Sequence, residues 1–467
     1  MTIDLSTITF TNGADIVPEF GEEDIVNTGI ANTLDGNDTI TGIGAGSNPF
    51  TPNSGYGIYN TGTLNTAEGN DIITGSGERD GIYNTGTLNT AEGNDIITAK
   101  GDYSPGIVNT GTFDTAEGND IITAKGDYSP GIDNSGTFNT GQGNDIITGS
   151  GTYGEGIYNS GTFNTADGND EITGIGSSSN GISIADGSIL DTGNGNDRIS
   201  GKAGLGIGIY NASFNFNTGD GNDTIEGSEG YNGIQNTGLI NTGNGKDTII
   251  AKGRTFDGKI FAAAVSNFST IETGNGEDII TATGGIENNG TIDTGDDDDI
   301  ITGSGGFSYS GDEISGIDNK GTIDTGNGND SIITEGLFIG TGGTINTGNG
   351  KDIITSSKAI DNGGTINTGN GVDFMIANGG FKGMGSVFLE NGKDYLNGFG
   401  TGNFNGGNNE DTLELPSGSY TVGISGTTMS FTNGDVIMYT SEFEKLIAGS
   451  TTYDFTSLTE GQTIVVA

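Results

Sequence analysis

A segment of about 24 to 25 residues recurs along most of this 467-residue chain. It reads GIYNTGTLNTAEGNDIITGSGERD from Gly57, and the copies that start at Gly81 and Gly106 differ from it at only a few positions before they reach the variable end. A fixed period of this length is typical of solenoids, in which one copy forms one coil and stacked coils bury each other's apolar face. The repeat therefore constrains the fold more than any other feature of the sequence.

Each copy carries three short apolar anchors at constant places. The first anchor follows the first glycine of the copy, as in Ile58, Ile82 and Ile107. The second precedes a pair made of a polar residue and threonine, as in Leu64, Leu88 and Phe113. The third lies two residues beyond the aspartate of a GND triplet, as in Ile73, Ile97 and Ile122. The residue before each third anchor varies freely, as in Glu171 and Arg198. A constant aliphatic beside a free position indicates a strand with one side chain inside and the next outside. Glycine is too frequent for helices to be expected, and no apolar stripe with a period of 3.6 residues persists along the chain.

Three strands per copy predict an all-β, right-handed parallel β-solenoid (a β-helix or β-roll), with a triangular or flattened cross-section. We expect residues 1–30 to form an N-terminal cap and residues 31–415 to form a solenoid of about 14–16 coils. Residues 416–467 contain less glycine and more alternating runs, which predicts a β-rich C-terminal cap.

The candidate metal-binding residues are the aspartates of the GND triplets and of looser copies. They are Asp38, Asp71, Asp95, Asp120, Asp145, Asp170, Asp197, Asp223, Asp247, Asp278, Asp299, Asp330, Asp352, Asp373, Asp394 and Asp411. Stacked carboxylates about 5 Å apart repel each other unless cations or protons neutralise them. The net charge of −47, from 62 acidic and 15 basic residues, adds to this need.

The segments before the third anchors, such as TGNGNDRIS from Thr192 and TGDGNDTIE from Thr218, resemble the calcium-binding nonapeptide G-G-x-G-x-D-x-U-x of the repeats-in-toxin (RTX, hemolysin-type) family. The resemblance spans roughly residues 30 to 415 and implies several Ca²⁺ ions between successive turns on one edge. Ca²⁺ takes six to eight oxygen ligands from carboxylates and backbone carbonyls. The glycines two residues before the aspartate are expected to help form the sites: Gly195, Gly221, Gly245, Gly276, Gly328, Gly350 and Gly371.

Two departures from the family pattern affect the expected sites. Each long coil has one such turn where the family has two, so we expect a single file of ions. TAEGND from Thr66, Thr90 and Thr115 lacks the second glycine, which predicts weaker sites near Asp71, Asp95 and Asp120. The competing interpretation is that the Asn-Gly and Asp-Gly turns are structural and bind no metal.

The absence of cysteine and histidine excludes disulfides, thiolate metal sites, cysteine nucleophiles and Ser-His-Asp triads, and we expect no enzyme. The acidic charge argues against nucleic acid and anionic lipid as partners. No run approaches the roughly 20 apolar residues of a membrane helix, and no signal peptide is visible at Met1 to Phe10. The last residues resemble the uncleaved C-terminal ends of RTX proteins, which implies leaderless type I secretion to the exterior or the cell surface.

The predicted function is that of a secreted protein that folds on calcium binding and serves as a structural or adhesive rod, with surface or matrix polysaccharide or self-association as partners. An ice-binding solenoid is one alternative, since outward Thr and Asn (Thr87 and Asn89, Thr137 and Asn139, Thr162 and Asn164) would form rows on one face. A polysaccharide-active β-helix enzyme is another. It would need clustered carboxylates and basic residues, and Arg198, Arg254, Lys259 and the run Asp296 to Asp299 do not converge in the sequence.

Overall fold

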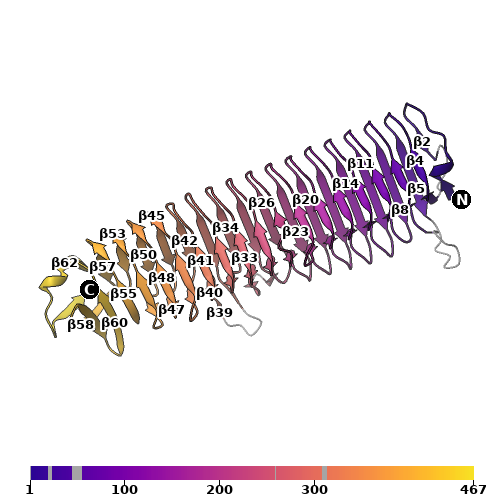
Figure 1. Ribbon diagram of the computed structural model, residues 1–467. Helices are drawn as coiled ribbons and strands as arrows, with labels where there is room; N and C mark the ends of the chain where they lie inside the picture. Colours follow the sequence, from indigo (N-terminus) through magenta and orange to yellow (C-terminus); the bar gives the residue numbers. More distant parts are fainter. Residues whose placement is uncertain (1, 19–23, 45–54, 258, 308–312) are drawn as a thin grey trace. The chain divides into compact units, whose positions relative to one another are not determined.

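The computed structural model describes residues 2–18, 24–44, 55–257, 259–307 and 313–467. Within these ranges the regular structure is almost entirely β-strand, and the helices are two single turns, η1 (Leu5–Thr7) and η2 (Phe455–Ser457). No helix in the described ranges has the length and apolar character needed to cross a membrane. The predicted all-β parallel solenoid is confirmed, and its coils are visible in Figure 1. Residues 1 and 19–23 of the predicted N-terminal cap lie outside the described residues.

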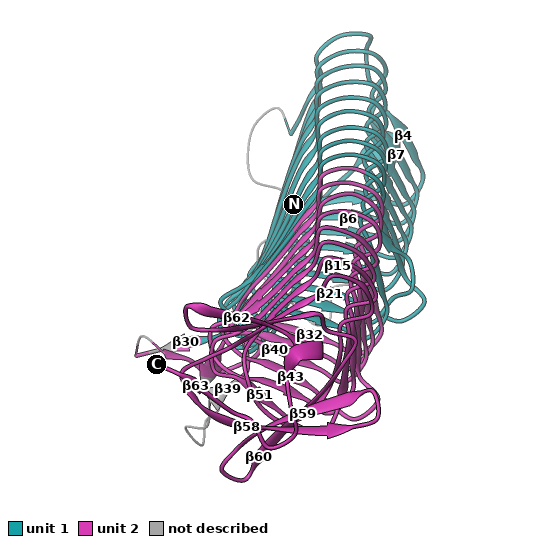
Figure 2. Ribbon diagram, turned by 90° about the vertical axis from the view of Figure 1, so that its left-hand side faces the viewer, with its two compact units in different colours: residues 1–244, 249–254 teal, residues 245–248, 255–467 magenta. Residues whose placement is uncertain are grey.

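The chain divides into two compact units, which Figure 2 colours separately: residues 1–244 with 249–254, and residues 245–248 with 255–467. In both units a typical coil contributes three strands, one to each of three parallel sheets. We number these sheets first, second and third in the order in which the chain visits them. The three apolar anchors of the repeat correspond to these three sides of a coil.

In unit 1 the strands of each sheet pair with the equivalent strands of neighbouring coils. The first sheet contains β1 (Thr2–Asp4), β3 (Asp24–Asn27), β6 (Ile58–Asn60), β9 (Ile82–Asn84), β12 (Ile107–Asn109), β15 (Ile132–Asn134), β18 (Ile157–Asn159), β21 (Ile182–Ile184), β24 (Ile209–Asn211) and β27 (Ile234–Asn236). The second contains β4 (Ile30–Asn32), β7 (Thr63–Asn65), β10 (Thr87–Asn89), β13 (Thr112–Asp114), β16 (Thr137–Asn139), β19 (Thr162–Asn164), β22 (Ile189–Asp191), β25 (Phe216–Asn217) and β28 (Leu239–Asn241). The third contains β2 (Ile16–Val17), β5 (Thr39–Gly44), β8 (Ile72–Gly77), β11 (Ile96–Gly101), β14 (Ile121–Gly126), β17 (Ile146–Gly151), β20 (Glu171–Gly176), β23 (Arg198–Ala203) and β26 (Thr224–Ser228), and β29 (Thr248–Lys252) follows in the chain.

Unit 2 repeats this arrangement with coils of more variable length, from 17 to 31 residues between successive aspartates. Its first sheet contains β32 (Val265–Asn267), β35 (Ile286–Asn288), β40 (Ile317–Asn319), β43 (Leu337–Ile339), β47 (Ile360–Asn362) and β51 (Phe381–Lys382). The second contains β33 (Thr270–Glu272), β36 (Thr291–Asp293), β41 (Thr322–Asp324), β44 (Thr344–Asn346), β48 (Thr365–Asn367), β52 (Ser386–Phe388) and β55 (Gly402–Asn405). The third contains β34 (Ile279–Thr283), β37 (Ile300–Ser304), β42 (Ser331–Thr334), β46 (Ile353–Ser356), β50 (Phe374–Ala377), β54 (Tyr395–Asn397) and β57 (Thr412–Leu415). Short strands at the aspartate corner form a fourth sheet: β45 (Asn349–Gly350), β49 (Asn370–Gly371), β53 (Asn391–Gly392) and β56 (Asn408–Asn409).

The variable segment of the coil holds two small hairpins in unit 2. One joins β30 (Thr255–Phe256) to β31 (Lys259–Ile260) on either side of Gly258, which lies outside the described residues. The other joins β38 (Gly306–Phe307) to β39 (Glu313–Ile314).

The core is a stack of identical anchors, because successive strands pair without a register shift. Ile122 pairs with Ile147, and Ile147 with Ile172, and all three side chains are at most 1% exposed. On the second sheet the rings of Phe113, Phe138 and Phe163 stack with centroids 4.5 Å apart. On the third sheet, the residue directly before each apolar anchor points outward, as its variability in the sequence predicted. Ile146, which precedes Ile147, is 43% exposed.

A buried ladder of asparagines joins the first sheet to the second. The Nδ2 atom of Asn60 donates to Oδ1 of Asn84 at 2.7 Å. In the same way Asn84 donates to Asn109 at 2.8 Å, and Asn109 donates to Asn134 at 2.9 Å. The same Nδ2 atom of Asn60 also donates to the Thr87 carbonyl oxygen at 2.8 Å. The turn of each N-T-G segment is thereby tied to the next coil, which explains the constant asparagine of the repeat.

The last fifty residues of unit 2 change from parallel to antiparallel pairing. Strand β58 (Gly418–Ser425) pairs with β59 (Thr428–Asn433) and β63 (Thr463–Val466), and β59 also pairs with β60 (Val436–Ser441). Strand β60 then pairs in parallel with β55, and β61 (Lys445–Ala448) pairs with β57 in parallel and with β62 (Thr451–Asp454) in antiparallel fashion. The final solenoid strands of the second and third sheets are therefore hydrogen-bonded to this segment.

Alanine substitutions at the adjacent residues Ile147 and Ile146 test the inward and outward assignment of a third-sheet strand. Ile147→Ala leaves a cavity in a packed stack and is expected to lower the free energy of unfolding by about 2–5 kcal/mol. Ile146→Ala, the matched control on the outer face, is expected to cost less than about 1 kcal/mol. Denaturant unfolding followed by circular dichroism measures both, and equal losses would contradict the assignment.

Candidate metal centre

All sixteen predicted aspartates are buried, each at most 2% exposed, at the corner where the second sheet passes into the third. Within unit 1 this corner holds the eight from Asp38 to Asp223, and within unit 2 it holds the eight from Asp247 to Asp411. The side chains point into the coil and not toward solvent. In each unit the structure therefore brings the predicted residues together as one file, with one carboxyl group per coil.

Along the file, Oδ1 of one aspartate accepts a hydrogen bond from the backbone N–H of the aspartate in the preceding coil. The N–H of Asp120 donates to Oδ1 of Asp145 at 2.8 Å, and the N–H of Asp145 donates to Oδ1 of Asp170 at 2.8 Å. In unit 2 the corresponding distances from Asp330 to Asp352 and from Asp352 to Asp373 are both 2.9 Å. The file is thus a continuous ladder in each unit, and it fixes the height of every corner relative to the next.

In unit 1 the asparagine before each aspartate forms a second, outer ladder of opposite direction. The N–H of Asn119 donates to Oδ1 of Asn94, in the preceding coil, at 2.8 Å, whereas the N–H of Asp120 donates to the following coil. Asn144 and Asn169 repeat the outer contact at 2.7 Å. Two adjacent peptide groups therefore bind the coils on either side, which accounts for the constant N-D pair of unit 1.

The glycines two residues before the aspartates lie where consecutive corners touch. Gly195 has φ +154°, and a Cβ there would stand 1.3 Å from the carbonyl oxygen of Gly168 in the preceding coil. Gly221, Gly276, Gly350 and Gly371 of the predicted set meet the preceding coil in the same way, at 1.4–1.5 Å. Stacking alone therefore demands glycine at these places. It also sets their carbonyl oxygens between coils, beside the aspartate file.

The TAEGND turns keep the same backbone at the cost of strain. Ala67, Ala91 and Ala116 have φ between +57° and +60°, where TGNGND turns have glycine, such as Gly193 at +80°. An L-residue in this left-handed region costs roughly 1–2 kcal/mol. Asp71, Asp95 and Asp120 are nevertheless buried and laddered as elsewhere, so the alanine does not displace the carboxyl group.

The second carboxylate oxygen is the atom that the described residues leave unsatisfied. Oδ2 is buried without a hydrogen-bond donor from the described part of the chain in most members of the file: Asp38, Asp71, Asp95, Asp120, Asp145, Asp170, Asp197, Asp278, Asp299, Asp352, Asp373, Asp394 and Asp411. In Asp330 the hydroxyl of Thr325 donates to Oδ2 at 2.8 Å. Thr115 instead donates to the Thr140 carbonyl oxygen of the next coil at 3.2 Å. Its hydroxyl also lies close enough to Asp120 to lower the pKa of that carboxyl group, against the larger effect of burial. A buried carboxylate oxygen without a donor requires a proton or a cation.

Burial makes the charged form of these groups costly. It raises the pKa of Asp95, Asp120 and Asp170 to about 7, and the pKa of Asp299 to about 8. Like charges in neighbouring coils add to the effect, since two unit charges about 5 Å apart repel by about 3 kcal/mol at an effective dielectric constant of about 20. At neutral pH the charged form of these four groups therefore needs a compensating proton or cation.

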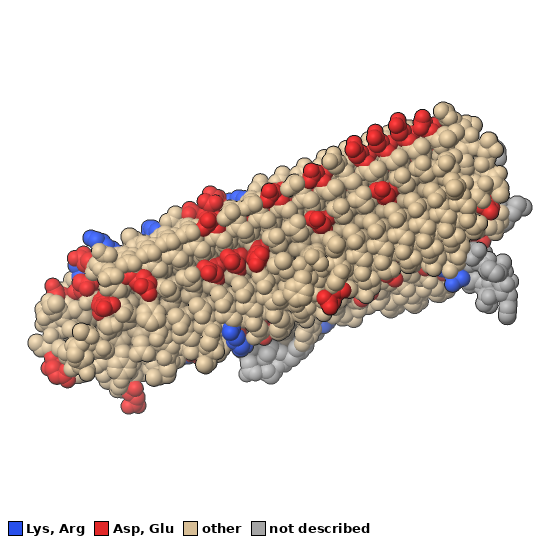
Figure 3. All heavy atoms as spheres, viewed as in Figure 1, with Lys and Arg blue, Asp and Glu red and all other residues tan. Residues whose placement is uncertain are grey.

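The remaining acidic residues are distributed differently. Figure 3 shows acidic side chains in rows on the surface, where basic side chains are few. Glu68, Glu92 and Glu117 are exposed residues of the same corner, and water and salt screen their charges. Arg198, one of the basic residues singled out in the sequence, forms an ion pair with Glu226 of the adjacent strand.

The donor set at the corner fits a hard cation such as Ca²⁺. Among the described residues, no three acidic side chains converge on a common point, so carboxylates alone do not form a cage. One carboxylate oxygen per coil and the glycine carbonyl oxygens between coils supply ligands of the kind that Ca²⁺ prefers. Zn²⁺ and other ions that favour nitrogen and sulfur have no histidine or cysteine to bind in this chain.

The ends of the ladder involve two residues that the sequence did not single out. The N–H of Asp15 donates to Oδ1 of Asp38 at 2.8 Å in unit 1, and the N–H of Asp411 donates to Oε2 of Glu444 at 2.8 Å in unit 2. Glu444 takes the place that the next aspartate would occupy. Neither residue lies in a G-x-G-N-D turn, so the motif offered no signal for them; only the pairing of β57 with β61 brings Glu444 there.

The raised pKa values predict that, in excess chelator, stability falls as pH rises. A carboxyl group whose pKa is higher in the folded state binds its proton more tightly when folded. Its contribution is complete below the unfolded pKa of about 4 and is lost as pH rises through about 6 to 8. Denaturant midpoints at pH 5, 6, 7 and 8 in chelator measure this effect, and midpoints that rise with pH would contradict it.

Comparisons with known proteins do not assign the chain to a family. No protein-family model matches it, and no curated protein matches it in sequence. Among solved structures it is similar to the crystal structure of a hyperactive, Ca²⁺-dependent, β-helical antifreeze protein from an Antarctic bacterium. The identity is 17% and the TM-score 0.43, with 82% of this chain and 94% of that chain covered.

Proposed function

We propose that this protein is a calcium-stabilised β-solenoid that works outside the cell as a structural or adhesive element and catalyses no reaction. The observation that carries the proposal is the file of buried aspartates, in most of which Oδ2 has no hydrogen-bond donor among the described residues. Ca²⁺ at the file neutralises the carboxylates without requiring a proton on each. The RTX-like spacing of the turns supports the same ion.

The aspartates of the file would hold the ions through Oδ2, together with carbonyl oxygens of the glycine turns, including Gly195, Gly245 and Gly328. The bound ion supplies charge neutralisation and a bridge between coils, which are structural roles. The chain's own contribution is to position one carboxylate per coil and to exclude water from it. Calcium binding thereby becomes part of the folding free energy.

An extracellular location follows from the ion. Where free calcium is submicromolar, the proposal has the folded chain only marginally stable at neutral pH, because a thin core barely offsets charge repulsion and chain entropy. Millimolar calcium outside the cell drives folding after export. Surface or matrix polysaccharide and self-association are the partners that suit a repetitive, polar sheet face.

A second candidate is ice binding, and one feature of unit 1 favours it. Thr63, Thr87, Thr112, Thr137 and Thr162 pair in register on the second sheet and face outward. Asn65, Asn89, Asn139 and Asn164, with Asp114, form a parallel outward row. A flat array of small hydroxyl and amide groups suits ordered water.

The substitution Asp145→Asn tests calcium binding at the file. The amide keeps the Oδ1 acceptor but removes the charge, so at pH 8 in chelator we expect the variant to be more stable than the wild type. Calcium should stabilise it less, by up to about 2.7 kcal/mol for one lost site at a free ion concentration of 100 times Kd. Unfolding with and without calcium measures both effects.

Asp186→Asn is the matched control, because Asp186 lies on an exposed turn of the same unit. It should change neither quantity. If calcium stabilised Asp145→Asn as strongly as the wild type, or if the wild type ignored calcium, the proposal would be wrong.

Bulky substitutions on two outer faces test the ice-binding candidate. Thr137→Tyr interrupts the threonine row of the second sheet and is expected to abolish most thermal hysteresis if this face binds ice. Thr148→Tyr makes the same change at an outward position of the third sheet and should preserve the activity. Nanolitre osmometry in excess calcium measures hysteresis, and its absence in the wild type rules out this candidate.

A further inference from the structure

A shallow groove lies on the second sheet of unit 2, where the solenoid meets the antiparallel segment. Three adjacent strands, β52, β55 and β60, place two rows of outward side chains there. One row is Ser386, Asn403 and Tyr439. The other row is Phe388, Asn405 and Ser441.

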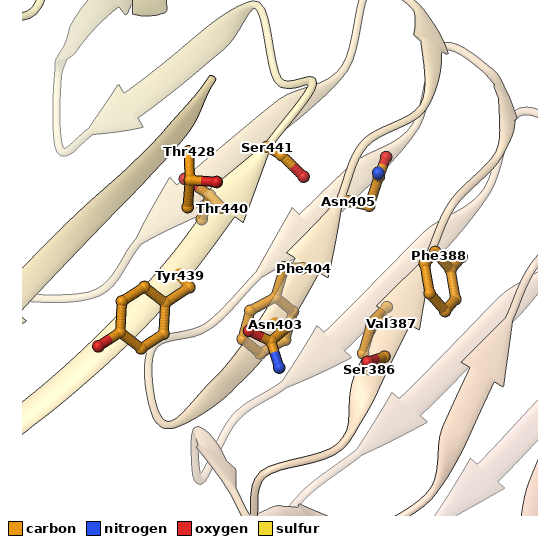
Figure 4. A pocket seen from close by; sticks show the side chains of 10 residues that line it. All are labelled: Ser386, Val387, Phe388, Asn403, Phe404, Asn405, Thr428, Tyr439, Thr440 and Ser441. Carbon is orange, nitrogen blue, oxygen red and sulfur yellow. The ribbon is translucent and has the colours of Figure 1, made fainter. Parts of the chain in front are cut away.

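The alternation of the strands separates this groove from the core. Val387, Phe404 and Thr440 lie between the two rows and point inward, at most 3% exposed. The outward side chains enclose a depression of about 140 Å³, to which Thr428 of β59 also contributes. Figure 4 shows the lining side chains, with the rings of Tyr439 and Phe388 on either side of Asn403 and Asn405.

The two aromatic rings are exposed without serving the fold. Tyr439 is 41% exposed and Phe388 is 37% exposed, and neither stacks on another ring of the described residues. Two strand spacings and two residues of offset separate them, or about 12 Å between Cα atoms. By contrast, the exposed Tyr103, Tyr128 and Tyr153 of unit 1 stack on each other.

The outward polar side chains of the groove carry no charge, and four of them have no hydrogen-bond partner in the part of the chain that the structure describes. Within the described residues, the side-chain amides of Asn403 and Asn405 have no hydrogen-bond partner, and the same holds for the hydroxyls of Ser386 and Ser441. None of the lining residues is charged, although the chain carries a net charge of −47. An ionic ligand would meet no counter-charge there, so the groove suits a neutral ligand rich in hydroxyl groups.

From these features we infer that the groove binds a neutral saccharide. The C–H faces of pyranose rings pack on Tyr439 and Phe388, while the amides and hydroxyls between them donate to and accept from sugar hydroxyls. The depression holds about one ring, and the aromatics extend the contact to its neighbours along a glycan. This site goes beyond the proposed calcium-dependent stability, and it depends on the solenoid only for a folded second sheet.

The site also assigns a role to the C-terminal segment beyond covering the last coil. Tyr439 and Ser441 belong to β60, whereas Phe388 and the two asparagines belong to solenoid strands. The pairing of β60 with β55 therefore completes the groove.

Isothermal titration of the full chain in excess calcium, with its fold verified by circular dichroism, tests the inference. The probes are cellotetraose, laminaritetraose, maltotetraose and mannotetraose, with tetragalacturonate as the charged comparison. We expect at least one neutral tetrasaccharide to bind with one-to-one stoichiometry and a Kd below about 1 mM. Tyr439→Ala and Phe388→Ala should each weaken that binding by about tenfold, and Tyr439→Phe should retain it.

Tyr103→Ala, which removes an exposed tyrosine in unit 1, is the matched control and should bind like the wild type. The inference is wrong if no neutral probe binds at about 10 mM, if tetragalacturonate binds equally well, or if both alanine variants bind like the wild type. Because all titrations use folded protein in calcium, their failure would not affect the calcium proposal. Failure of the calcium proposal would appear instead as unchanged folding in chelator.

Discussion

The hydrogen bond from each aspartate N–H to the Oδ1 atom of the next aspartate is the contact on which the solenoid depends. It holds the corner of one coil at a fixed height above the corner of the next, and the strands that follow inherit that register. Ile122, Ile147 and Ile172 stack in the core because their preceding aspartates are already aligned. The same contact brings the carboxyl groups into a buried, closely spaced file. The hydrogen bonds that align the coils therefore also place the negative charges of neighbouring carboxylates where they repel each other.

That conflict connects the fold to its proposed chemistry. A neutral residue at the same position could accept the N–H without a buried charge, yet the chain carries aspartate in every turn of the file. In Asp330 the hydroxyl of a threonine donates a hydrogen bond to Oδ2. A hydrogen bond of this kind leaves the proton on the hydroxyl, so the carboxylate remains charged. A divalent cation removes it and joins adjacent coils. Exposed acidic residues such as Glu92 give no such coupling, because solvent already screens them.

Much of this could be predicted from the sequence, because a stack of equivalent coils repeats every local rule many times. The buried isoleucines, the outward free positions and the alignment of one carboxyl group per coil follow from period and alternation, whereas the burial of that group does not. Other features depend on contacts between coils that a single copy does not contain. The opposite directions of the asparagine and aspartate ladders are of this kind, as is the steric demand for glycine at Gly195, which the turn motif alone attributes to the metal.

The non-repetitive end was the least predictable part. Alternation in residues 418 to 467 indicates strands, but not which solenoid strands they join. The pairing of β60 with β55 brings Tyr439 beside Asn403, and the pairing of β61 with β57 brings Glu444 to the end of the aspartate file. Neither neighbour is encoded by spacing, because long-range pairing decides both.

Anomalous scattering from crystals grown in calcium tests the central claim most directly. The account predicts a single row of calcium peaks in each unit, next to the Oδ2 atoms of the aspartate file and spaced by about one strand separation. Crystals that contain no such peaks, or that place calcium only at the exposed glutamates of the same corner, would contradict it.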